Sequence, residues 1–220
     1  MLRFAIALLL VLPPLAARAL CTSDDVPPVH TLVERFTRAD CLSCWRDGSG
    51  PRPTADTLVL DWVVPGLKAG RAAFATGASD DAMERLDWLH RPLPASGVTS
   101  VTSRRAGEPV QLRIAHGDAF NDYVGVSMEL RDAGSEAWHA WLLLVERIPA
   151  GPGGSPVART VVRKVFRPEW QRAGRGSGPL AETRSIQVPA WTPPQRVRLV
   201  AVLQDGRGRI RAIAQTECRE

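Results

Sequence analysis

The feature that most restricts the fold is a series of short strand-like segments in the second half of the chain. Val124, Val126, Met128 and Leu130 alternate with polar or small residues, which is the period of a strand with one buried face. Turn-forming residues separate this segment from six others, and none shows the spacing of an amphipathic helix. Seven short strands joined by turns predict an antiparallel β-sandwich. The segments are residues 110–115, 124–131, 138–146, 160–166, 183–188, 197–204 and 210–215.

The residues before Gly107 follow a different pattern, in which strands and a helix alternate. Residues 30–36 and 98–103 are expected to be strands, and residues 57–64 form a mostly apolar run typical of a buried strand. Ser79 and the two aspartates after it suit the start of a helix, because they accept hydrogen bonds from free N–H groups and favour its positive end. This order of elements predicts a small α/β domain.

The first 19 residues predict a cleavable export signal. A positive start at Arg3 precedes an apolar run that ends at Leu12, and the small residues Ala17 and Ala19 suit a signal peptidase. The run is too short for a membrane anchor, because crossing a bilayer takes ~20 apolar residues. We therefore expect cleavage near Ala19 and a periplasmic or secreted protein whose mature chain has no membrane span.

The mature chain is expected to contain two domains. Residues 20–105 form the α/β domain and residues 106–220 form the β-sandwich, so the fold class is α+β. The whole chain has 28 Lys and Arg against 23 Asp and Glu, but the basic residues are scattered among acidic ones and lack adjacent aromatic side chains. A nucleic-acid partner is therefore not expected. No cofactor motif is present, so no cofactor is expected, and the sequence leaves the oligomeric state open.

Four cysteines in an exported chain predict disulfides. Cys21 and Cys218 lie near the two ends of the mature chain, and the even number of cysteines favours a structural bridge between them. Cys41 and Cys44 form a CxxC motif soon after the strand expected at residues 30–36. A zinc site is not expected there, since the motif supplies only two of the four ligands that structural zinc needs.

A strand that delivers a CxxC motif to its carboxyl end is the thioredoxin arrangement. The two cysteines of such a motif close into a small reducible ring. Here, the nine residues after Cys44 (45–53) include two glycines and two prolines. These residues allow a single turn of helix at most. A Thr-Pro pair ahead of the third strand is also missing, although the fold normally has a cis proline at that place.

The chain resembles a family of bacterial secreted proteins known as domain of unknown function 1223. The likeness rests on Phe36 and Thr37 before the CxxC motif, on the segment 160–163, on Trp170 and on the closing hairpin segments. The resemblance implies a thioredoxin-like domain followed by a β-rich domain. It also implies that Cys41 is the attacking thiol and Cys44 the resolving one.

Two functions are open at this stage. In the first, Cys41 and Cys44 exchange with the thiols or disulfides of another periplasmic protein, which would make the chain a thiol–disulfide oxidoreductase. In the second, the thioredoxin-like domain has lost its chemistry and both cysteine pairs are structural. The chain would then be a non-enzymatic binding or assembly module of the cell envelope. The intact motif favours the first function, and the weak helix after it favours the second.

The remaining candidates are one tryptophan and the histidines. Trp45 directly follows Cys44 and is expected either to cover this thiol or to belong to a partner-binding surface. The four histidines are far apart in the sequence and lack metal-type spacing, so none is assigned a catalytic or metal-binding role. They are His30, His90, His116 and His139.

Overall fold

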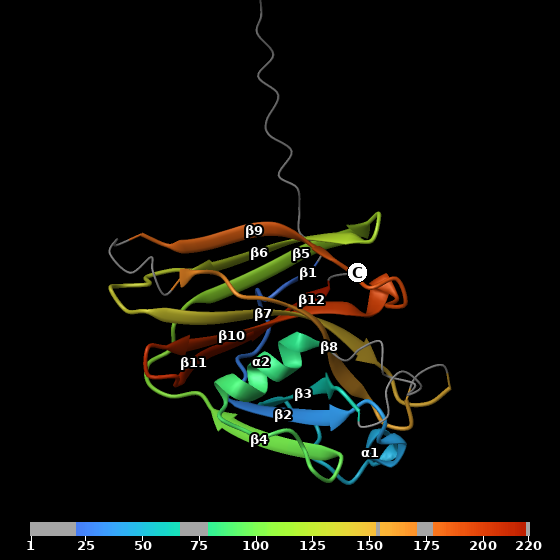
Figure 1. The fold of residues 1–220 in the computed structure, drawn as a ribbon. Helices are drawn as coiled ribbons and strands as arrows, with labels where there is room; N and C mark the ends of the chain where they lie inside the picture. The colour runs from blue at the N-terminus through green and yellow to red at the C-terminus, as the bar shows by residue number, and fades with distance from the viewer. Residues whose placement is uncertain (1–20, 67–78, 153–154, 171–177, 219–220) are drawn as a thin grey trace, which may run out of the picture.

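The computed structural model describes residues 21–66, 79–152, 155–170 and 178–218, and the expected export signal lies outside this part. Two β-sheets are stacked on each other, and the helix α2 packs against the larger sheet (Figure 1). The described residues are therefore rich in β-structure and contain few helices, which fits the α+β class expected from the sequence.

The smaller sheet has five strands in the order β12–β1–β5–β6–β9. All its neighbouring strands are antiparallel. The two strands at one edge come from opposite ends of the described chain and have only two residues each, so they bring these ends together. The strands are β1 (Cys21–Thr22), β5 (Leu112–Phe120), β6 (Tyr123–Leu130), β9 (Leu180–Gln187) and β12 (Glu217–Cys218).

The larger sheet has seven strands in the order β11–β10–β7–β8–β3–β2–β4. Strand β2 is parallel to β3 and antiparallel to β4. The pairing of Asp61 with Val161 joins β3 to β8, so strands from both sides of residue 105 belong to one sheet. The strands are β2 (Thr31–Arg38), β3 (Thr57–Val64), β4 (Val98–Arg104), β7 (Trp138–Ile148), β8 (Arg159–Phe166), β10 (Val197–Asp205) and β11 (Ile210–Gln215).

The helices of the described residues are short. Helix α1 (Leu42–Arg46) has five residues, as expected from the glycines and prolines that follow it. Helix α2 (Asp80–Trp88) has Ser79 as its N-cap, and the serine side chain accepts a hydrogen bond from the backbone N–H of Ala82. A 3-10 helix, η3 (Pro194–Arg196), precedes β10. No helix in this part is long and apolar enough to cross a membrane.

The strands of the larger sheet contribute to two separate hydrophobic cores. Side chains of successive strand residues point to opposite faces. Leu142 and Leu144 of β7 and Leu199 of β10 therefore pack with residues of the smaller sheet. Trp141 and Leu143 of β7 pack on the other face, in the core that includes residues of α2. Burial on both faces explains why these strands are almost continuously apolar in sequence.

A buried ion pair fixes α2 on the larger sheet. Arg85 of α2 donates from Nε and from one terminal nitrogen to the two carboxylate oxygens of Glu34 in β2, each at 2.8 Å, and both side chains are 1% exposed. Arg85 also donates to Oε1 of Gln204 in β10 at 3.1 Å, and Trp62 in β3 donates to Glu34 at 3.1 Å. The pair therefore links α2 to the neighbouring strands β2 and β3 and to the distant strand β10.

Candidate functional site

The CxxC motif lies at the carboxyl end of β2, where the sequence predicts it. Cys41 and Cys44 form a disulfide, and both cysteines are half-buried. Leu42, between them, is 49% exposed. Directly after β2, the backbone N–H of Ala39 donates a hydrogen bond to the carbonyl of Val64 at the end of β3. The motif is thus tied to the sheet, and both of its cysteines are partly exposed.

Cys41 forms the N-terminal cap of α1. Its sulfur accepts a hydrogen bond from the backbone N–H of Cys44 at 3.4 Å, and the hydroxyl of Ser43 lies 3.6 Å from it. The sulfur of the first cysteine thus has two hydrogen-bonding groups close to it, both from the turn that follows.

The backbone of Gly97 lies directly against the disulfide. A Cβ atom added at this glycine would lie 2.7 Å from Cys41 Sγ and 2.8 Å from Cys44 Sγ. The residue has φ +96°, and its carbonyl accepts a hydrogen bond from the Arg38 N–H at 2.8 Å. The described residues contain no cis peptide bond. A glycine in a left-handed conformation, just before β4, therefore supplies the backbone that faces the sulfurs.

Gly97→Ala is expected to make the Cys41–Cys44 disulfide easier to reduce. The new methyl group would overlap two sulfurs that the disulfide holds in place, whereas the sulfurs of the dithiol are free to rotate away. Strain of about 1–3 kcal/mol that acts on the disulfide alone corresponds to a rise of about 20–60 mV in reduction potential, measured by glutathione titration. Gly151→Ala is the matched control, because Gly151 has φ +102° and nothing within 4 Å of an added Cβ. Equal potentials in the two variants would contradict this expectation.

Trp45 anchors α1 to the sheet. It is 2% exposed, and its indole N–H donates to the Arg38 carbonyl at 2.9 Å. It packs with Ala39, Val63 and Val161. The interpretation that Trp45 belongs to a partner-binding surface is wrong, because burial removes it from reach of a partner. The apolar side chain that the motif does expose is that of Leu42.

A buried network of charged residues lies behind the motif. Arg159 of β8 donates to the carbonyls of Cys44 at 3.2 Å and Trp45 at 2.6 Å, and to a carboxylate oxygen of Asp61 at 3.0 Å. Arg35 donates to the other oxygen of Asp61 at 2.9 Å. Burial raises the pKa of Asp61, and the two guanidinium groups oppose this rise. The network fixes the carboxyl end of α1, where a cation is favourable.

The sequence contained a signal for this network that the strand pattern did not explain. Asp61 is the single charged residue in the apolar strand of residues 57–64, and a charge in such a strand needs a partner to be buried. The partner Arg159 lies 98 residues further along the chain. Its identity therefore depends on the pairing of β3 with β8.

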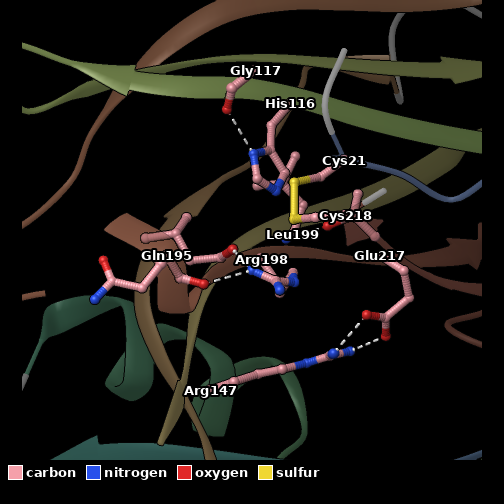
Figure 2. The surroundings of a disulfide bond; sticks show 11 residues. Cys21, His116, Gly117, Arg147, Gln195, Arg198, Leu199, Glu217 and Cys218 are labelled. Atoms are coloured by element: carbon pink, nitrogen blue, oxygen red, sulfur yellow. Dashed lines mark hydrogen bonds and ion pairs between the residues drawn. A yellow bond between two sulfur atoms is a disulfide. The ribbon is translucent and has the colours of Figure 1, made fainter. Parts of the chain in front are cut away.

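Cys21 and Cys218 form the second disulfide, which joins β1 to β12 (Figure 2). The two cysteines are directly opposite each other in the antiparallel pair, and Cys21 is also opposite His116 of β5. A cavity of about 550 Å³ opens beside these residues, and Arg198 is part of its lining. The bridge thus has a histidine and a cavity next to it.

The other histidines do not contribute to either cysteine pair in the described residues. His30 lies 2.5 Å from a carboxylate oxygen of Asp56 on the surface. His139 packs against Trp88 with the rings tilted and their centroids 4.7 Å apart, and His90 is exposed. His116 is the one that the sequence analysis failed to single out. Sequence spacing could not reveal it, because its neighbours Cys21 and Cys218 lie about a hundred residues away on either side.

Comparison with known proteins adds little to this site. No known protein family and no curated protein matches the sequence. Among solved structures, chicken MD-1 complexed with lipid IVa is similar at 15% sequence identity, over 50% of this chain and 90% of that chain, with a TM-score of 0.24. A likeness at this score carries no argument about fold or function, so the function must be inferred from the geometry of the chain itself.

Proposed function

We propose that this chain is an exported thiol–disulfide exchange protein of the periplasm, in which Cys41 and Cys44 alternate between dithiol and disulfide. The observation that carries the proposal is a half-buried disulfide at the end of a sheet strand with exposed apolar side chains on both sides. Leu42 is 49% exposed, and Val98, next to Gly97, is 38% exposed. Such side chains suit the docking of an extended segment of a substrate protein.

The order of elements around the motif supports a thioredoxin-like domain. The CxxC motif follows β2, which is parallel to β3 and antiparallel to β4, and α2 connects β3 to β4. The Gly97 backbone occupies the place before β4 at which a thioredoxin-like protein normally has its cis proline. Because glycine has no side chain, the backbone of Gly97 itself lies next to the two sulfurs.

The exchange takes place in two substitutions at sulfur. In the reducing direction, the Cys41 thiolate attacks one sulfur of a substrate disulfide, and the other substrate sulfur leaves as a thiolate and takes up a proton. Cys44 then loses its proton and attacks the Cys41 sulfur of the mixed disulfide, which releases the second substrate thiol. Two electrons pass from the motif to the substrate, and the reverse sequence oxidises a substrate dithiol. A second dithiol or disulfide protein restores the motif.

A second candidate is a binding or assembly module in which the motif is a structural staple. It is favoured by the five-residue length of α1 and by the contacts of Arg159 with the carbonyls of Cys44 and Trp45. A helix this short has only a small macrodipole at its N-terminus, where Cys41 lies. The reduction potential separates the two candidates.

The test is a glutathione titration in which the alkylated peptides of each cysteine pair are followed by mass spectrometry. A potential of the Cys41–Cys44 pair between about −120 and −270 mV is expected for an exchange protein, whereas a value below about −300 mV would identify a staple. Cys44→Ser and Cys41→Ser are the matched variants. When reduced Cys44→Ser is mixed with a substrate protein that contains a disulfide, it should accumulate a mixed disulfide through Cys41, because the resolving thiol is absent. Cys41→Ser should not, and equal trapping by both variants would refute the assigned roles.

A further inference from the structure

Two cysteine sulfurs and one histidine nitrogen, all possible metal ligands, lie together at the edge of the smaller sheet. Cys218, Cys21 and His116 occupy directly opposing positions on three adjacent strands, and opposing side chains of antiparallel strands approach each other closely. The two sulfurs and one imidazole nitrogen all lie within 4.8 Å of one another. In Figure 2 the imidazole ring lies beside the Cys21 sulfur. The register of β12, β1 and β5 therefore assembles an S₂N ligand set.

The hydrogen bonding of His116 leaves one nitrogen available. Nδ1 lies 2.9 Å from the Gly117 carbonyl oxygen, and because a carbonyl only accepts hydrogen bonds, Nδ1 carries the proton. In the neutral ring Nε2 then has a free lone pair, and it is buried without a hydrogen-bond partner, in a residue that is 5% exposed. A protonated nitrogen bonded to a backbone carbonyl, with the other nitrogen free, is the usual arrangement of a metal-binding histidine.

The surroundings also suit a cation bound by two thiolates. A metal binds the neutral form of histidine, and Arg198, next to His116 in the cavity lining, adds positive charge to its surroundings. The cavity of about 550 Å³ is lined by both cysteines, His116 and Arg198, which gives a path to the ligand atoms. A singly charged cation held by two thiolates carries one net negative charge, and the guanidinium of Arg198 offsets it.

We propose that, once the Cys21–Cys218 disulfide is reduced, Cys21 Sγ, Cys218 Sγ and His116 Nε2 form a three-coordinate site for Cu(I). Thiolate and imidazole ligands select soft metals such as Cu(I) and zinc. Structural zinc requires four ligands, and the described residues within reach supply three. Three ligands complete a trigonal Cu(I) site, so copper fits this set better.

The chemistry balances with a dithiol as the reductant. The reducing dithiol transfers two electrons and two protons to the Cys21–Cys218 bond and itself becomes a disulfide. The resulting pair of thiols loses both protons when Cu(I) binds, while His116 binds through its existing lone pair and releases none. The oxidation state of copper does not change. The redox state of the cysteine pair thus controls metal binding: the disulfide does not bind Cu(I), and the dithiol does.

The test uses Cys41→Ser/Cys44→Ser, so that the CxxC motif does not bind the metal. The protein is reduced by a phosphine under anaerobic conditions, desalted and titrated with Cu(I) held by a coloured chelator. One equivalent of Cu(I) is expected to move to the reduced protein and none to the oxidised one. X-ray absorption at the copper edge should show sulfur and imidazole nitrogen ligands.

Two variants locate the site. His116→Ala should weaken Cu(I) binding by about tenfold or more, since even the loss of an outer supporting residue has effects of this size. His90→Ala, at an exposed histidine, should leave it unchanged. The proposal is overturned by absence of Cu(I) binding, by sulfur-only coordination, by an unchanged affinity in His116→Ala, or by tighter binding of zinc than of Cu(I). Loss of the circular dichroism of the folded protein on reduction also overturns it, because the sheet register brings the ligands together.

Discussion

Replacing Arg85 with alanine should lower the free energy of unfolding by about 3–5 kcal/mol. The change leaves the carboxylate of Glu34 buried without its guanidinium partner, and an unpaired buried charge has a penalty of this size. It also removes the hydrogen bond from Arg85 to Gln204 of β10. Urea denaturation followed by tryptophan fluorescence measures the loss.

The exposed pair of Arg131 and Glu129 provides the comparison for Arg85. These side chains are 57% and 35% exposed, with a shortest separation of 3.0 Å. Arg131→Ala should change the free energy of unfolding by at most about 1 kcal/mol, because solvent screens the pair. If Arg131→Ala and Arg85→Ala lowered the free energy of unfolding by similar amounts, burial would not be the reason that the Glu34–Arg85 pair stabilises the protein.

Replacing both Cys21 and Cys218 with serine should lower the free energy of unfolding by about 2–5 kcal/mol. The bridge spans a sequence separation of 197 residues, and closing so long a loop removes many conformations from the unfolded chain. Strands β1 and β12 have two residues each, so the bridge adds to the few backbone hydrogen bonds between them. The loss is measured by denaturation of the oxidised proteins.

The Cys41→Ser/Cys44→Ser variant is the control for loop length. Its disulfide spans a separation of three residues, for which the same entropy argument gives about 2 kcal/mol. The terminal bridge should therefore be the more important of the two for stability, and hydrogen exchange at β1 and β12 should rise only when it is absent. A larger loss from removing the CxxC disulfide would contradict this view.

The alternating and continuous apolar patterns together located most strands correctly. Residues 57–64 match β3 without error, and residues 138–146 fall short of β7 by two residues. The segment of residues 110–115 was less accurate, since β5 extends from Leu112 to Phe120. The missed portion contains a register shift between His116 and Ala119. A bulge interrupts the two-residue period, so the pattern could not identify that part of the strand.

The sequence also located the cysteine motif at the end of β2, but it gave an incomplete picture of the surroundings. For Trp45 the sequence left open a cover over the thiol or a partner-binding surface, and the side chain is in fact buried, with the Arg159 guanidinium over its ring. No sequence pattern marked Gly97 as part of the site, although its backbone faces both sulfurs. Each of these contacts joins residues on different strands, and sequence separation contains no information about them.

The sequence by itself determined which segments are strands, where α2 begins and which strand carries the CxxC motif. These properties depend on residues a few positions apart, through side-chain alternation and hydrogen bonds at helix ends. The tertiary structure decided that β8 lies beside β3, that Arg159 reaches Asp61, and that His116 lies beside the terminal disulfide. The physical reason is that strand order and register arise from packing of the whole chain. They bring together residues about a hundred positions apart, which no local pattern encodes.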